Sequence, residues 1–141
     1  MGQRLRIMAA LDDVRRATTF VAQAAADAGL SDKDVYHCEV AVEEACTNIV
    51  QHGVTASPSD EHHIILSASA NGTAFQIIIQ DDTPPFNPLT YEVSNLGDEL
   101  AKRQPGGLGI HFFKNLMDDV SYEYQAPYNQ LTLRKRLSGS P

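Results

Sequence analysis

Residues 31–53 read SDKDVYHCEVAVEEACTNIVQHG, and this stretch has the pattern of one long helix. Ser31 is a favourable N-cap residue, and an acidic residue follows it three positions later, as at many helix starts. The pattern continues to about His52, and Gly53 is expected to end the helix. Glu44 and Asn48 are four residues apart in sequence, so their side chains project from one face of this helix.

A short strand and another helix are expected before residue 31. The alternation of apolar residues over 3–10 predicts the strand. Residues up to about Ala28 have apolar side chains at helical spacing, with Asp12 or Asp13 as the expected cap and Gly29 as the expected end.

Two hairpins and a third helix are expected after residue 53. The first hairpin pairs strands 63–70 and 74–80 around a turn at Asn71-Gly72. The second pairs strands 120–125 and 130–137 around a turn at Pro127-Tyr128-Asn129. An apolar helix over 108–117 is expected between the two hairpins. A doubly wound fold needs strict alternation of strands and helices, which this order lacks. The order predicts an α+β fold of two layers, with three helices on one face of a mixed, mostly antiparallel sheet.

Length and charge limit the classes of protein to consider. A chain of 141 residues predicts one domain over 1–141, with a frayed tail at 138–141. The net charge of -7 argues against direct binding to nucleic acid or to anionic membranes. No run approaches the ~20 apolar residues of a membrane span, and no signal peptide is recognisable, so a cytoplasmic protein is expected.

Glu44 and Asn48 together suit phosphoryl transfer. Asn48 offers an oxygen ligand for Mg2+, and Glu44 can accept a proton from an attacking hydroxyl or water. Taken alone, however, the pair is explained more simply as an exposed polar surface of a helix.

Two further segments suggest a nucleotide. Asp81 follows a predicted strand directly, so its carboxylate lies at the rim of the sheet, where it can accept the exocyclic amine of adenine. Gly106, Gly107 and Gly109 precede the third helix, and backbone N–H groups at such a start favour anions. The intervening segment, 81–107, holds four of the seven prolines and is predicted to be a lid.

Three motifs in this order resemble those of one superfamily. The segment 43–53, EEACTNIVQHG, resembles the N box of the GHKL ATPases, and 81–88, DDTPPFNP, resembles their first glycine box. The segments 106–124, GGLGIHFFKNLMDDVSYEY, and 129–137, NQLTLRKRL, resemble the second glycine box and the terminal strands. Within the superfamily, the chain is most similar to the anti-sigma-factor serine/threonine kinases of the RsbW and SpoIIAB type.

The resemblance implies a Bergerat, histidine-kinase-like fold and a set of site residues. It makes Glu44 the catalytic base and Asn48 the Mg2+ ligand. The remaining residues implied to bind ATP are Asp81, Thr83, Phe86, Gly106, Gly107, Leu108 and Gly109. Thr83 departs from the family pattern, because the first glycine box has glycine at that position. A Cβ there restricts the backbone and narrows the space beside adenine.

The resemblance also implies partners. Kinases of this type transfer the γ-phosphoryl group of ATP to a serine of a STAS-domain anti-anti-sigma factor, bind a sigma factor and form homodimers. A noncatalytic module that sequesters a partner under the control of ATP is the alternative function. The ATP-binding half of a histidine kinase is disfavoured, because 141 residues leave no space for a phosphoacceptor domain.

Overall fold

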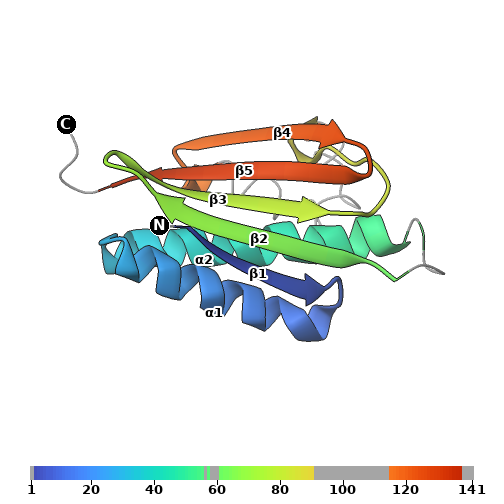
Figure 1. Ribbon diagram of the computed structural model, residues 1–141, viewed down its shortest axis with the longest axis horizontal. Coiled ribbons are helices and arrows are strands. Elements are labelled where there is room, and N and C mark those ends of the chain that lie inside the picture. Colours follow the sequence, from blue (N-terminus) through green and yellow to red (C-terminus); the bar gives the residue numbers. More distant parts are fainter. Residues whose placement is uncertain (1, 56, 58–60, 91–114, 138–141) are drawn as a thin grey trace, which may run out of the picture.

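The computed structural model describes residues 2–55, 57, 61–90 and 115–137. In this part of the chain, two α-helices cover one face of a five-stranded sheet (Figure 1). The elements in chain order are β1 (Gln3–Met8), α1 (Leu11–Asp27), α2 (Asp32–Asn48), a π-helical turn (Ile49–Val54), β2 (His63–Ala70), β3 (Ala74–Asp81), a 3-10 turn (Pro88–Thr90), β4 (Asp119–Gln125) and β5 (Tyr128–Arg136).

The sheet has the strand order β1-β2-β3-β5-β4, and every neighbouring pair is antiparallel. The α+β class is therefore confirmed, but the expectation of a mixed sheet is wrong. The reason is visible in Figure 1. The two helices between β1 and β2 run in opposite directions and return the chain to the end where β1 finished. Within each hairpin, a tight turn joins the two strands.

The described residues contain two long helices and not the three that the sequence predicts. Of the predicted third helix, 108–117, only 115–117 are described, and Asn115 and Leu116 are helical. The predicted lid beyond residue 90 and the tail at 138–141 also lie outside the described residues. Neither described helix is long and apolar enough to cross a membrane.

The core lies between the helices and the inward face of the sheet. Side chains alternate strictly along β2 and β3, so every second residue is buried. The central row pairs Leu66 with Ile79, and Ile79 with Leu131. One row further along, the partner of Ile64 is Asp81, whose other neighbour is Asn129. The inward face thus changes from apolar to polar at one end of the sheet.

The ends of the helices match the sequence in part. The Oγ of Ser31 accepts the N–H of Asp34 at 3.2 Å, which confirms the predicted cap of α2. Gly29 has a φ of 94° just after α1, which confirms the predicted end. The predicted cap of α1 is wrong, because the N–H of Asp13 already donates to the carbonyl of Ala10 and starts the helix earlier. The Asp13 carboxylate accepts the N–H of Met8 at 3.1 Å instead.

Two predicted turns also need correction. Gly53 does not end the helix, because the chain continues through it as the π-helical turn Ile49–Val54. In the last hairpin, Tyr128 and Asn129 belong to β5 and pair with β4, so only Ala126 and Pro127 lie between the strands. The Asn71 turn is as predicted, with its side-chain Oδ1 accepting the N–H groups of Thr73 and Ala74 at 2.7 and 2.8 Å.

Candidate functional site

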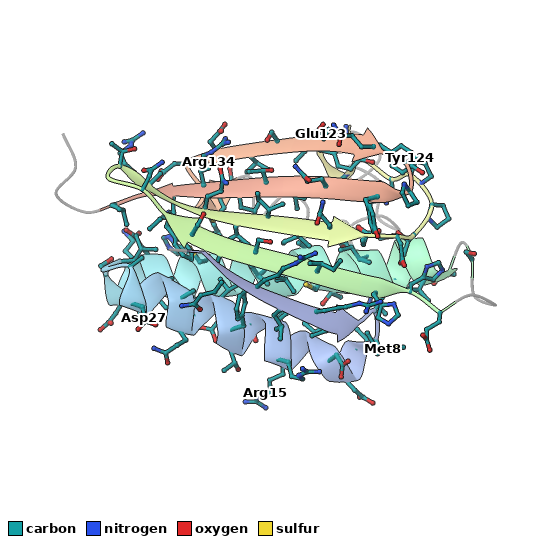
Figure 2. The ribbon with its side chains drawn as sticks, viewed as in Figure 1. Met8, Arg15, Asp27, Glu123, Tyr124 and Arg134 are labelled. Carbon is teal, nitrogen blue, oxygen red and sulfur yellow. The ribbon has the colours of Figure 1, made fainter. Side chains whose placement is uncertain are left out.

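A pocket lies where the C-terminal part of α2 meets the polar end of the sheet. It holds about 390 Å³ of space between the surrounding atoms, open solvent at its mouth included. Tyr124 is labelled in Figure 2 and marks this end of the sheet, because it pairs with Asn129. The lining residues are Ala45, Asn48, Ile49, Gly53, Asp81, Thr83, Phe86, Pro88, Tyr122, Asn129 and Leu131.

Asn48 is the polar residue that α2 contributes to this pocket. Its side chain is buried, with a relative exposure of 2%, and neither the Oδ1 nor the Nδ2 atom has a hydrogen-bond partner among the described residues. A buried polar group without a partner costs about 1–3 kcal/mol of stability. Such a cost is understandable where the group is kept for a ligand.

A carboxamide oxygen is a suitable ligand for Mg2+, so Asn48 fits the ion implied by the sequence. No cluster of three His, Cys, Asp or Glu side chains that could hold a metal occurs in the described ranges. Protein sites for Mg2+ commonly use one or two side chains and complete the shell with substrate phosphates and water. The single ligand Asn48 is consistent with that kind of site.

Glu44 lies one turn before Asn48 on α2 and is partly exposed. It does not line the pocket itself. Partial burial raises the pKa of its carboxyl group, and the negative charge of the neighbouring Glu43 raises it further. A carboxylate with a raised pKa is a stronger proton acceptor than an ordinary surface glutamate.

Asp81 lines the pocket and is 5% exposed. Its Oδ1 accepts three hydrogen bonds: from the N–H of Thr83 at 3.1 Å, from the Thr83 hydroxyl, and from the Nδ2 of Asn129 at 3.0 Å. Burial raises the pKa of Asp81, while the hydrogen bonds from Thr83 and Asn129 act in the opposite direction.

Thr83 fills the space between Asp81 and the π-helical turn. Its side chain is buried against Gly53, where an added Cβ would lie 2.3 Å from the Thr83 Oγ1 and 2.7 Å from its Cβ. Real Cβ atoms essentially never make non-bonded contacts this short. Thr83 and Gly53 are therefore sterically matched, and the continuation of the helix through Gly53 depends on its lack of a side chain.

Phe86 lines the pocket and packs against His52, which does not line it. Their rings are stacked with centroids 5.3 Å apart and planes inclined by 17°. Partial burial lowers the pKa of His52, which favours the neutral imidazole. The stacked pair joins the turn after β3 to the π-helical turn after α2.

Asn129 is a site residue that the sequence reasoning missed. It is 4% exposed on β5, directly opposite Asp81. A signal was present, since Asn129, Leu131 and Leu133 alternate along one strand and so share the inward face. The sequence prediction placed Asn129 in a turn, and that error concealed the pattern.

The structure thus brings Asn48, Asp81, Thr83 and Phe86 together around one pocket, with Glu44 one turn away from it on α2. The predicted glycine-rich turn, Gly106, Gly107, Leu108 and Gly109, lies outside the described residues.

Comparison with known proteins identifies the class. The family model of the histidine kinase-like ATPase domain matches residues 7–135, which is most of the chain. The chain therefore belongs to the histidine kinase-like ATPase (GHKL) domain family, and it is an ATP-binding domain of that class.

Among curated proteins, the chain is similar to the serine-protein kinase RsbW of Listeria innocua, with 32% identity over 71% of this chain and 65% of that protein. It is 31% identical to RsbW of Bacillus licheniformis, over 65% of this chain and 59% of that protein. The serine/threonine-protein kinase BtrW of Bordetella bronchiseptica is 29% identical over 64% of this chain and 63% of its own length. The matched region spans less than two thirds of the length of each of these relatives.

Solved structures show the same fold. The RsbU and RsbW domains of a Mycobacterium tuberculosis protein superpose with a TM-score of 0.66 at 18% identity, over 96% of this chain and 32% of that one. The histidine kinase AdeS of Acinetobacter baumannii gives a TM-score of 0.51 at 12% identity, over 96% of this chain and 68% of that one. The Bergerat-like fold predicted from the sequence is confirmed.

Proposed function

We propose that this chain is an ATP-dependent serine/threonine protein kinase and anti-sigma factor. It phosphorylates a serine of a STAS-domain anti-anti-sigma factor, binds a sigma factor and acts as a homodimer. Similarity to RsbW and BtrW supports the class of reaction. The observation that carries the proposal is the buried carboxamide of Asn48, which lies without a partner among the described residues in a pocket shared with Asp81.

The proposed roles divide the site into an end that binds the nucleobase and an end that binds the phosphates. Asp81 accepts the exocyclic amine of adenine, next to Thr83 and Phe86, which line the same pocket. Asn48 holds Mg2+, which when bound neutralises negative charge on the phosphate oxygens. Gly106, Gly107, Leu108 and Gly109 supply backbone N–H groups to the phosphates.

Glu44 is the proposed general base for the transfer. The serine hydroxyl oxygen forms a bond to the γ-phosphorus, the bond from that phosphorus to the bridging oxygen of ADP breaks, and the hydroxyl proton passes to the Glu44 carboxylate. The place of Glu44 on α2 suits this role, because it is accessible to a protein substrate and only one turn from Asn48. Its raised pKa strengthens it as a proton acceptor.

The test is phosphoryl transfer with purified proteins. The chain is incubated with γ-labelled ATP, Mg2+ and each STAS-domain protein of the source genome in turn, and the products are analysed for phosphoserine. The proposal expects label on one STAS protein, at a serine. Binding of ATP without label on any of them would contradict the kinase function.

The alternative is a noncatalytic module in which ATP only sets the shape of the binding surface. Glu44 separates the two functions. Binding of ATP and sequestration of a partner need Asn48 and Asp81, whereas phosphoryl transfer also needs the general base Glu44.

A further inference from the structure

Asn129 is the centre of a hydrogen-bond network at the end of the pocket proposed to bind the nucleobase. Its Nδ2 donates to the Asp81 Oδ1 at 3.0 Å, to the Thr83 carbonyl at 3.0 Å and to the Pro84 carbonyl at 3.2 Å. Its Oδ1 accepts the N–H of Phe86 at 3.0 Å and the hydroxyl of Tyr122. One side chain thus connects the end of β3, the turn after it, and β4.

The orientation of this carboxamide is fixed by its partners. The N–H of Phe86 can only donate, so it must face the oxygen of Asn129. The Asp81 carboxylate and the two backbone carbonyls can only accept, so they must face the nitrogen. A flipped amide would oppose like groups at the contacts with Phe86, Asp81 and the two backbone carbonyls, which leaves Asn129 a single arrangement.

The two oxygens of Asp81 have different surroundings. All three donors go to Oδ1, two from Thr83 and one from Asn129. In the described part of the chain, no hydrogen bond reaches Oδ2, although Asp81 lines the pocket. A carboxylate with one saturated oxygen cannot rotate without losing those bonds, so it presents the other oxygen in a fixed direction.

We infer that Asn129 is a specificity-determining residue for the nucleobase: with Thr83 it locks Asp81 so that Oδ2 alone accepts the exocyclic 6-amino group of a purine. This inference rests on the proposed ATP site and adds the residue that makes the site selective for adenine. A hydrogen bond from the amine to an immobile carboxylate oxygen discriminates by about 10-fold or more against a purine without that amine. An unlocked carboxylate can turn towards water and loses that discrimination.

The test compares ATP with purine riboside 5′-triphosphate, which lacks the 6-amino group, by titration calorimetry in the presence of Mg2+. The unsubstituted chain is expected to prefer ATP by at least about 10-fold. Asn129→Leu keeps a similar volume without hydrogen-bonding atoms, and it is expected to bring the ratio of the two dissociation constants close to one. The affinity for the analogue should remain within about threefold of the original.

Gln130→Leu is the matched control, because it removes the neighbouring carboxamide from the opposite face of β5, where the Oε1 of Gln130 accepts a hydrogen bond from the Nε2 of Gln80 at 3.0 Å. Its ATP preference should be unchanged. Thr83→Val removes one donor to Asp81 while keeping the volume against Gly53, and it should reduce the preference in the same direction. This variant decides the question if Asn129→Leu does not fold.

An undiminished preference for ATP in Asn129→Leu, or in Thr83→Val where the first variant is unfolded, would overturn the inference. Equal weakening of both nucleotides would do the same, because it would show a merely structural role for Asn129. Failure of the unsubstituted chain to bind either nucleotide is a different result, which would overturn the proposed function together with this inference.

Discussion

Helices α1 and α2 have the same length, 17 residues each, and cover the same face of the sheet, but they bury different kinds of side chain. The inward side of α1 is apolar except for Thr18, whose hydroxyl donates to the carbonyl of Arg15 at 3.0 Å. The inward side of α2 carries Asn48, whose carboxamide has no partner in the described ranges. A helix that only covers a core satisfies its buried polar groups, whereas α2 leaves one for a ligand.

The ends of the two helices differ in the same way. Helix α1 stops at Gly29, and Figure 2 shows Arg15 and Asp27 projecting from it away from the sheet. Helix α2 continues into a π-helical turn that brings Gly53 against Thr83. Short π-helical segments are frequent at functional sites, and here the segment forms one wall of the pocket.

The largest expected effect is on catalysis by α2. Glu44→Gln removes the proposed base but keeps the size of the side chain, so phosphoryl transfer to the STAS partner should fall by about 10²–10⁴-fold. Initial rates with labelled ATP measure the effect. ATP affinity should stay within about threefold, and a variant that transfers phosphate at the original rate would remove Glu44 from the mechanism.

A second pair of substitutions compares the buried polar residues of the two helices. Asn48→Leu replaces an unpartnered carboxamide by an apolar group of similar size, so the unfolding free energy should rise by about 1 kcal/mol. Affinity for ATP with Mg2+ should fall by at least about 10-fold. Chemical denaturation and calorimetry measure the two effects.

Thr18→Val is the control on α1. It should lose about 0.5–1 kcal/mol of stability with its hydrogen bond and leave nucleotide affinity unchanged. Loss of stability in Asn48→Leu together with unchanged ATP binding would erase the proposed difference between the helices.

A third substitution tests the end of α2. Gly53→Ala places a Cβ within 2.3 Å of the Thr83 Oγ1, so it should cost about 1–3 kcal/mol of stability. Adding Thr83→Gly removes the opposing atoms and should restore most of the loss, giving a coupling energy of at least about 1 kcal/mol in a double-mutant cycle. Additive effects would show that the two residues are not sterically matched.

The smallest expected effect is on the pH dependence of the transfer. Burial and the charge of Glu43 raise the pKa of Glu44, and a general base works only when deprotonated. The rate should therefore fall as the pH drops through a midpoint above the ordinary value for glutamate. Glu43→Gln should move that midpoint to lower pH, and Glu39→Gln on the same helix should leave it in place. If Glu43→Gln left the midpoint unchanged, the fall in rate at low pH could not be assigned to Glu44.

Local patterns predicted much of the fold. The Ser31 cap, the end at Gly29 and the Asn71 hairpin each depend on a few neighbouring residues, and each is confirmed. The class of sheet followed from the order of elements. Its fully antiparallel pairing did not, because it depends on how the helix pair between β1 and β2 returns the chain.

The candidate site was only partly accessible from the sequence. Glu44 and Asn48 share a helix and Asp81 ends a strand, so spacing alone could suggest them. The role of Asn129 depends on β5 pairing with β3, which brings together residues 48 positions apart in sequence. The contact between Gly53 and Thr83 depends on a π-helical turn that residue periodicity does not reveal.

The central claim is that the pocket between α2 and the sheet binds ATP with Mg2+. Titration calorimetry of ATP and ADP, each with and without Mg2+, tests it most directly. The proposed site predicts binding of ATP that is tighter with Mg2+ than without it, and a Mg2+ dependence that Asn48→Leu abolishes. No binding of either nucleotide in either condition would contradict the claim.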